Sequence, residues 1–209
     1  MRNGVFVTFE GIDGCGKTTQ LTLAHEALLK KGVPCMVTRE PGGTAIGEKI
    51  RDIILSPEHG EMNDRCELFL YMAARAQHAA ETIVPCVKKG MVALCDRFAD
   101  ATFAYQGHGR GIPIDILEKM NSYAVDSVQP TFTFLFDISV ETSKRRLAQA
   151  GKTADRLEGS GAEFYERVRK GYLALAKQFP HRIMVLSGDR AAPDLSAVVC
   201  AKILELYRL

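Results

Sequence analysis

Three features are scarce or missing in this sequence, and each absence excludes a class of protein. None of the six cysteines stands in a C-x-x-C pair, so the spacing excludes the common zinc and redox motifs and a disulfide framework. No run approaches the roughly eighteen apolar residues of a membrane helix, and the first apolar stretch ends early, at Glu10, unlike a secretion signal. Lys and Arg number 27 against 25 Asp and Glu, so the basic excess of a nucleic-acid binder is absent.

The composition is that of an ordinary folded protein. Hydrophobic residues make up 46% of the chain and charged residues 25%, far from the composition of a disordered chain. At about 150 residues per domain, a length of 209 predicts a single domain over residues 1–209. We expect a cytoplasmic protein with no nucleic-acid or membrane partner, whose free cysteines act as small core side chains.

Short apolar runs alternate with helix-length segments along the whole chain. Each run is followed by a polar or glycine-bearing turn, and the runs cover residues 5–9, 35–37, 91–95, 132–136 and 183–186. Because the runs are continuous rather than alternating, they predict strands that are buried on both faces of a parallel sheet. The pattern therefore predicts an α/β fold with a five-stranded parallel sheet flanked by helices.

The helical segments have recognisable ends. The clearest are residues 18–31 before Gly32, residues 63–89 before Gly90 with Pro85 inside, and residues 140–150 after the expected N-cap Ser139. Residues 151–161 hold charged side chains and three glycines with no period, which predicts a surface loop between two helices.

One motif carries clear chemistry. Residues 11–18, G-I-D-G-C-G-K-T, match G-x-x-x-x-G-K-[ST] and lie between the first predicted strand and the first predicted helix. In such a loop the backbone N–H groups and the helix N-terminus hold phosphates, Lys17 reaches the β- and γ-phosphates, and Thr18 holds Mg²⁺. A tight glycine turn is the plain alternative. The predicted nucleotide-binding residues are Gly11, Ile12, Asp13, Gly14, Cys15, Gly16, Lys17, Thr18 and Thr19.

Other segments narrow the class of P-loop protein. The guanine-reading N-K-x-D of GTPases does not occur, and the apolar run 92–95 leads into Asp96-Arg97 rather than the Asp-Glu of hydrolysing ATPases. An arginine beside the acid suits a second phosphate ligand better than an activated water. We therefore expect the acceptor to be another phosphorylated molecule.

Four more motifs follow the phosphate loop in a fixed order. They are T-R-E-P-G-G at residues 38–43, A-A-R at 73–75, D-R-F at 96–98 followed by A-Y-Q-G at 104–107, and D-R-L-E at 155–158. With the phosphate loop they resemble the thymidylate kinase family over nearly the whole chain. The resemblance implies a P-loop NTPase fold with a lid at about residues 150–161. It also implies a homodimer that moves the γ-phosphoryl of MgATP to dTMP, giving dTDP and ADP in dTTP biosynthesis.

The resemblance also implies an acceptor site. In it, Arg39 and Arg97 bind the acceptor phosphate. The ring of Tyr71 stacks on the base and Arg75 donates to the base edge. Tyr105 lies beside the deoxyribose, together with Gln106. The residues alone leave a plainer alternative for each: a surface ion pair for Arg39, an arginine extending from a core helix beside a packed tyrosine for Arg75, and a core side chain for Tyr105.

The acids of the site have implied roles as well. In the family an acid at the position of Asp13 binds the sugar 3′-hydroxyl and approaches Mg²⁺, so the expected metal ligands are Thr18, Asp13 and Asp96. The five histidines show no metal spacing, and we expect them to be ordinary helix or loop residues. Gln77 and His78 are expected to face solvent.

The source of the catalytic cation is left open by the sequence. Gly14 and Cys15 are small, so the chain resembles family members whose lid supplies basic groups, and the candidates are Arg146, Lys152 and Arg156. Gln149 and Ala150 depart from the usual arginine-rich lid, and residues 144–146 could form only a solvated helix face. The full set of expected catalytic residues is Lys17, Arg97, Asp13, Arg146 and Arg156.

Two rival functions stay open on the sequence. A deoxynucleoside kinase of related fold takes an unphosphorylated acceptor, and two arginines at the acceptor edge argue against it. A nucleotide-binding switch has no acceptor at all.

Overall fold

The computed structural model describes residues 4–125, 128–151, 156–157 and 161–208. Its centre is one sheet of five parallel strands in the order β2-β3-β1-β4-β5, which confirms the predicted architecture. The strands are β1 (Val5–Glu10), β2 (Cys35–Arg39), β3 (Val92–Asp96), β4 (Phe132–Asp137) and β5 (Ile183–Ser187).

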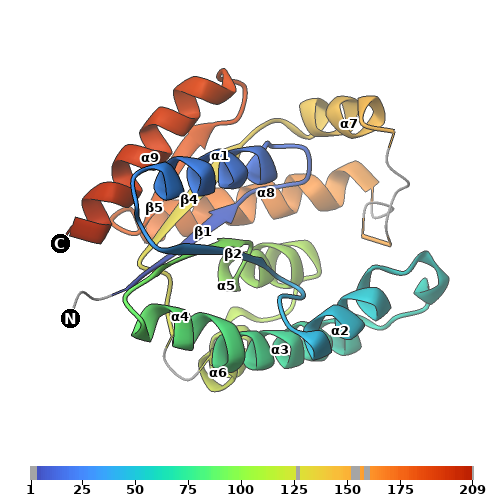
Figure 1. Cartoon of the computed structure of the whole chain (residues 1–209). Helices are drawn as coiled ribbons and strands as arrows, with labels where there is room; N and C mark the ends of the chain where they lie inside the picture. The colour runs from blue at the N-terminus through green and yellow to red at the C-terminus, as the bar shows by residue number, and fades with distance from the viewer. Residues whose placement is uncertain (1–3, 126–127, 152–155, 158–160, 209) are drawn as a thin grey trace.

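Helices cover both faces of the sheet (Figure 1). Figure 1 shows α1 and α9 on one side and α3, α4 and α6 on the other. The α-helices are α1 (Lys17–Lys30), α2 (Ala45–Leu55), α3 (Asp64–His78), α4 (Val84–Lys88), α5 (Ala99–Thr102), α6 (Ile114–Val125), α7 (Val140–Gln149), α8 (Gly161–Gln178) and α9 (Ala192–Arg208). In the described part of the chain no helix is long and apolar enough to cross a membrane.

Side chains on the two faces of β1 belong to two different apolar clusters. Val5, Val7 and Phe9 lie in the cluster that includes residues of α1 and α9, whereas Phe6 packs in a second cluster with Phe98. All six residues of β1 are buried, as expected for a central strand of a parallel sheet. Burial of both faces fixes the register, because a slip of one residue would exchange the two clusters.

The segment predicted as one long helix is continuous but irregular. It starts at α3, where the side chain of Asn63 caps the backbone N–H of Arg65, and it passes through a π-helical stretch, Ala79–Ile83, into α4. Pro85 lies one residue into α4 and cannot donate to the carbonyl of residue 81. The widened π-helical turn lies immediately before α4. The segment ends at Gly90, whose φ is 72°.

The other predicted helix ends are close to the observed ones. Helix α1 begins one residue earlier than expected and is followed by Gly32, whose φ is 70°. The hydroxyl of Ser139 accepts from the backbone N–H of Thr142 at 3.1 Å and caps α7. Of the predicted surface loop, residues 152–155 and 158–160 lie outside the described residues, and α8 begins at Gly161.

The parallel register brings the carboxyl ends of three strands together. Arg39 of β2 and Phe9 of β1 both lie opposite Asp96 of β3. Such an edge is where open α/β sheets bind ligands, and the motifs that the sequence singled out follow these three strands.

Candidate active site

The phosphate loop connects the end of β1 to α1. Gly11 has φ 134° and Gly16 φ 96°, a region that residues with a Cβ rarely adopt. At Gly11 a Cβ would also collide with the carbonyl oxygen of Phe136. Gly16 caps α1 without a side chain, so the N–H groups of the first helical turn are left for a ligand. An anion is the ligand that such a helix start favours.

Lys17 is folded into this loop. Its Nζ donates to the carbonyl oxygens of Gly11 at 3.0 Å and Ile12 at 3.2 Å, and the residue is buried. The ammonium group is therefore held beside the turn of the loop, where the motif predicts phosphate. Ile12 and Cys15, which the sequence placed in the nucleotide site, have side chains in the apolar core and can contribute only backbone.

One pair of oxygen ligands fits a magnesium ion. The hydroxyl of Thr18 donates to Oδ2 of Asp96 at 3.2 Å, and both residues line the hollow in front of the phosphate loop. Mg²⁺ takes oxygen ligands and is usually held by one or two protein groups with phosphates and water. Among the described residues no cluster of three or more His, Cys, Asp or Glu could hold a metal by itself, which agrees with that mode.

Arg97 lies at the centre of the site. Its guanidinium donates to Asp13 at 2.6 Å, to the carbonyl of Gly11 at 3.0 Å and to the hydroxyl of Tyr172 at 3.2 Å. The guanidinium carbon is 5.0 Å from the centroid of the Tyr105 ring. The backbone φ of Arg97 is 69°, in the left-handed region that favours glycine. Such a conformation costs a non-glycine residue about 1–3 kcal/mol and persists only where surrounding contacts impose it.

The two acids beside Arg97 have opposite electrostatics. Burial alone would raise the pKa of Asp13, but the charges of Arg97 and Lys17 outweigh it and lower the pKa to about 2. Glu10, at the end of β1, accepts from the backbone N–H of Phe98 and from the Tyr172 hydroxyl. Burial, reinforced by the charge of Asp100, raises the pKa of Glu10 to about 8.

Two hollows meet at this point. The first lies in front of the phosphate loop and is lined by Asp13, Gly14, Gly16, Lys17, Thr18, Thr19, Arg39, Glu40, Arg51, Asp96, Arg97, Arg146, Leu147 and Ala150; we call it the donor hollow. The second, the acceptor hollow, is lined by Asp13, Glu40, Pro41, Arg51, Leu55, Tyr71, Arg75, Arg97, Phe98, Ala101, Thr102, Tyr105, Gln106 and Leu157. The two share the side chains of Asp13, Glu40, Arg51 and Arg97.

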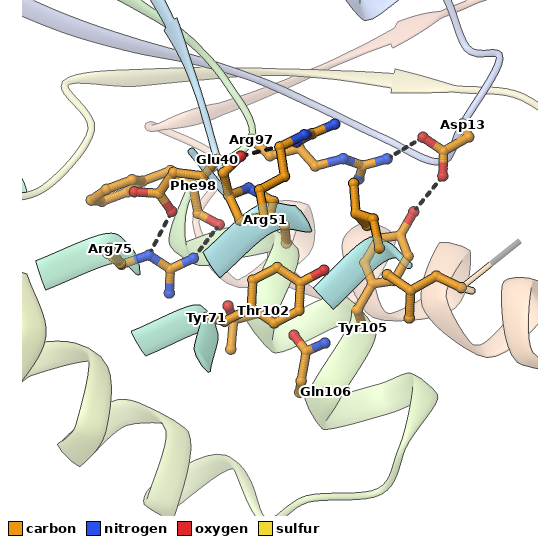
Figure 2. A pocket seen from close by; sticks show the side chains of 14 residues that line it. Asp13, Glu40, Arg51, Tyr71, Arg75, Arg97, Phe98, Thr102, Tyr105 and Gln106 are labelled. Carbon is orange, nitrogen blue, oxygen red and sulfur yellow. Dashed lines mark hydrogen bonds and ion pairs between the residues drawn. The ribbon is translucent and has the colours of Figure 1, made fainter. Parts of the chain in front are cut away.

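The acceptor hollow combines aromatic rings with polar and charged side chains (Figure 2). Figure 2 shows the side chains of Tyr71, Arg75, Tyr105 and Gln106 around it. The hydroxyl of Tyr105 donates to Asp13 at 3.3 Å. A flat polar ligand with an anionic end fits such a lining, because rings stack on its faces while donors meet its edge.

The comparisons with known proteins agree with this geometry. The sequence model of thymidylate kinases matches residues 9–197. The chain belongs to the thymidylate kinase family. This membership confirms the resemblance that the motifs indicated.

Individual relatives cover most of the chain. It is 50% identical over 188 residues to a thymidylate kinase of Pelotomaculum thermopropionicum, covering 90% of this chain and 87% of that protein. It is 47% identical over 191 residues to one of a Geobacter species, covering 89% and 85%. The crystal structure of thymidylate kinase from Ehrlichia chaffeensis has a TM-score of 0.78 at 33% identity, covering 97% of this chain and 99% of that one.

Arg75, in the thymidylate kinase motif A-A-R, is tied to the protein on three sides. It is 1% exposed, and it donates through Nε to Glu40 at 2.8 Å, through one terminal nitrogen to the Phe98 carbonyl at 3.0 Å and through the other to Asn121 at 3.2 Å. It is therefore no arginine that extends to solvent. Because a guanidinium has five N–H bonds, two remain for a ligand of the acceptor hollow.

The expectation that His78 faces solvent is wrong. Its side chain is fully buried, with Nδ1 2.9 Å from Glu40 and Nε2 2.6 Å from the hydroxyl of Thr38. His78 lies three positions after Arg75 in α3, so one helix face carries both. The small neighbours Ala76 and Ala79 were the signal that this stretch packs closely.

Arg39 is not among the residues that line the acceptor hollow. It lines the donor hollow and pairs with Glu48 at 2.7 Å, with half of its side chain exposed. Arg51 lines both hollows, as Arg97 does, and it donates to the carbonyl of Pro41 at 2.9 Å. The sequence did not predict Arg51, because it lies on α2, outside the five motifs that indicate the thymidylate kinase family.

The candidate cations of the lid lie apart from one another. Arg146 lines the donor hollow, but its guanidinium donates to the carbonyls of Gly14 and Gly188 and pairs with Asp189. Arg156 lines neither hollow. Lys152 lies outside the described residues. The structure therefore brings one of the three beside the phosphate loop.

Arg156 instead reaches an acid on α3. It pairs with Glu67 at 2.6 Å and donates to the carbonyl of Ile54 at 2.8 Å. Glu67 is fully buried and also accepts from Gln106 at 2.9 Å and Arg110 at 3.1 Å. Burial would raise the pKa of Glu67, but its three donors lower it. Glu67 thus connects the D-R-L-E segment to the Gln106 wall of the acceptor hollow.

Proposed function

We propose that this chain transfers the γ-phosphoryl group of MgATP to dTMP, forming dTDP and ADP for dTTP biosynthesis. The observation that carries the proposal is the meeting of the donor and acceptor hollows at Arg97 and Asp13. A transferred phosphoryl group needs two adjacent sites and fixed positive charge between them. Both hollows open at one edge of one sheet, so the whole chain is proposed to act as a single catalytic domain.

The donor half of the reaction falls to the phosphate loop. With nucleotide bound, Lys17 would turn from the loop carbonyls to the β- and γ-phosphates. Thr18 and Asp96 would hold Mg²⁺, which would neutralise phosphate charge. Both carboxylate oxygens of Asp13 already bind Arg97 and Tyr105. We therefore assign Asp13 to holding these two groups and the sugar 3′-hydroxyl rather than to the metal.

The acceptor half falls to the second hollow. Tyr71 stacks on the thymine ring, and the two unused N–H bonds of Arg75 donate to the base edge. Tyr105 and Gln106 contact the deoxyribose side. Arg97 bridges the acceptor phosphate and the transferred phosphoryl group, where preorganised charge lowers the barrier most.

Arg97 is also our first candidate for the catalytic cation. Arg156 lines neither hollow and Arg146 lines the donor hollow alone, whereas Arg97 lies where the two hollows meet. No general base is required, because phosphoryl transfer depends on positioning and charge neutralisation.

A homodimer and a cytoplasmic location complete the proposal. Apolar side chains are exposed on neighbouring helices, with Phe69 of α3 at 63% and Tyr123 of α6 at 94% exposure, and a dimer would cover such groups. The six cysteines are all free, which suits a reducing compartment. Light scattering of the purified protein measures the assembly directly, and a monomeric mass would refute the dimer.

An acceptor panel tests the function. With MgATP fixed, we expect kcat/KM to rank dTMP above dUMP and dUMP above UMP. The thymine methyl adds only about 0.8 kcal/mol of burial, and a 2′-hydroxyl would press against Tyr105. We expect dCMP to be poor, because its amino group meets donors of Arg75 that are then left unpaired at about 1–3 kcal/mol. Equal use of dCMP and dTMP would refute the pocket. Turnover of thymidine instead of dTMP would favour a deoxynucleoside kinase.

A further inference from the structure

A chain of buried polar contacts runs from β2 through α3 to the acceptor hollow. The hydroxyl of Thr38 is 2.6 Å from Nε2 of His78, and Nδ1 of His78 is 2.9 Å from Oε1 of Glu40. The other oxygen of Glu40 accepts from Nε of Arg75 at 2.8 Å. All four residues are buried, with Thr38 the most exposed at 8%, so water does not compete for these contacts.

The chemistry of the end groups fixes the protons along this chain. A guanidinium only donates, so Arg75 takes one oxygen of the Glu40 carboxylate as acceptor. The other oxygen of Glu40 then accepts the N–H at Nδ1 of His78. In the neutral imidazole Nε2 is therefore the acceptor, and the Thr38 hydroxyl donates to it. Thr38 thus holds the ring in the tautomer that Glu40 needs.

The ring is also fixed by packing. A Cβ on Gly43 would lie 2.6 Å from the His78 ring and from the Thr38 hydroxyl, so the backbone of the T-R-E-P-G-G turn closes directly over this contact. The ring has no room to rotate while that turn keeps its shape. Glu40 belongs to the same turn and lines both hollows.

We infer that His78 is a positioning residue for acceptor recognition: it fixes the carboxylate of Glu40, which in turn fixes the edge that Arg75 presents to the base. The inference rests on the proposed function, in which that edge reads thymine. Without the Nδ1 contact, the Glu40 carboxylate keeps one partner instead of two. It then no longer fixes the orientation of the Arg75 guanidinium plane. Donors must be held in place for a base edge to be read with full selectivity.

Two isosteric substitutions separate this role from simple filling of the core. In His78→Asn the amide nitrogen can occupy the place of Nδ1, keeping the bond to Glu40 and losing the one to Thr38. In His78→Gln the amide lies near the place of Nε2, keeping Thr38 and losing Glu40. His181 is exposed on the surface, so His181→Asn and His181→Gln are matched controls.

The test is the dissociation constants of dTMP and dCMP, measured by calorimetry without ATP, together with kcat at saturating dTMP. We expect His78→Gln to weaken dTMP binding about tenfold and to narrow the dTMP to dCMP ratio several-fold. We expect His78→Asn and both controls to stay within about twofold of the intact protein. Turnover at saturating dTMP should change less than about threefold in all four, because Lys17 and Arg97 lie outside the chain of contacts.

Equal effects of the two His78 variants, or an unchanged binding ratio in His78→Gln, would overturn the inference. If either variant fails to fold, Thr38→Val replaces it, since it keeps the ring and removes only the hydroxyl that sets the tautomer. The expected result is a smaller narrowing of the dTMP to dCMP binding ratio, about twofold to threefold, and no narrowing would refute the role of His78. The intact protein is measured first: failure to bind or phosphorylate dTMP there would refute the proposed function itself.

Discussion

The donor and acceptor hollows are built in different ways. Seven of the fourteen residues that line the donor hollow lie between positions 13 and 19 or at 96, and the loop acts largely through backbone. The acceptor hollow draws its walls from the turn after β2, from α2, α3 and α5, and from the π-helical stretch Phe103–Gly109. Arg75, which lines this hollow, is held by partners 23, 35 and 46 residues away in the sequence. A local motif builds the first hollow, and long-range side-chain pairing builds the second.

This difference determines how each hollow responds to substitution. Backbone in a glycine-rich loop accepts any nucleoside triphosphate that offers phosphates, whereas a network of paired buried groups tolerates few changes without leaving one group unsatisfied. We therefore expect substitutions in the donor hollow to affect turnover and substitutions in the acceptor network to affect selectivity.

The largest effect is expected in the donor hollow. Lys17→Ala should lower kcat about 10²-fold or more, because it removes a fixed charge from the transferred phosphoryl group. The protein should stay folded and should bind dTMP with an unchanged dissociation constant. Steady-state kinetics and calorimetry measure the two quantities. Near-normal turnover by the folded variant would contradict the donor assignment, and weakened dTMP binding would break the division between the hollows.

The next largest effect is expected at the base edge. Arg75→Ala should narrow the preference for dTMP over dCMP by about tenfold or more, because the donors that cytosine leaves unpaired are gone. The kcat/KM values for both acceptors measure the change, and circular dichroism controls for folding, since the substitution also leaves Glu40 with one partner fewer. An unaltered ratio in the folded variant would mean that another group reads the base.

The same contrast decides how much the sequence could predict. The five strands, the phosphate loop and the Asp96-Arg97 pair followed from periodicity and spacing, because each depends on neighbours in the chain. Glu40, Glu67 and Arg51 were missed, since their roles come from partners brought near only by folding: Glu67 and Arg156 are 89 residues apart. His78 was misjudged for the same reason, because helical position alone does not say which face is covered.

A smaller effect is expected from the D-R-L-E segment. Arg156→Ala should raise KM for dTMP about tenfold and leave kcat within about threefold, because Arg156 holds Glu67, and through it Gln106, rather than a phosphate. Glu67→Gln should act in the same direction, and the two changes should not add. A fall in kcat with KM unchanged would mark a transition-state contact and would restore Arg156 as the catalytic cation.

The smallest effect is expected on the pH dependence of stability, through the buried carboxyl group of Glu10. Folding raises the pKa of Glu10 from 4.5 to about 8, so between these pH values the native state binds a proton that the unfolded state releases. The free energy of unfolding should then fall as pH rises through this window, by at most about 1.4 kcal/mol per pH unit. Glu10→Gln cannot titrate and should show a flatter dependence. Urea unfolding at pH 5, 6.5 and 8 measures both slopes, and equal slopes would contradict the buried-proton account.

We expect the phosphoryl group to pass directly from the donor hollow to the acceptor hollow. Phosphorus NMR of the intact protein with MgATP and dTMP follows every phosphate at once. We predict that dTDP and ADP appear in equal amounts while inorganic phosphate stays at background, and that ADP formation stops when dTMP is left out. Release of inorganic phosphate at the same rate with and without dTMP would contradict the claim, because the donor hollow would then serve hydrolysis rather than transfer.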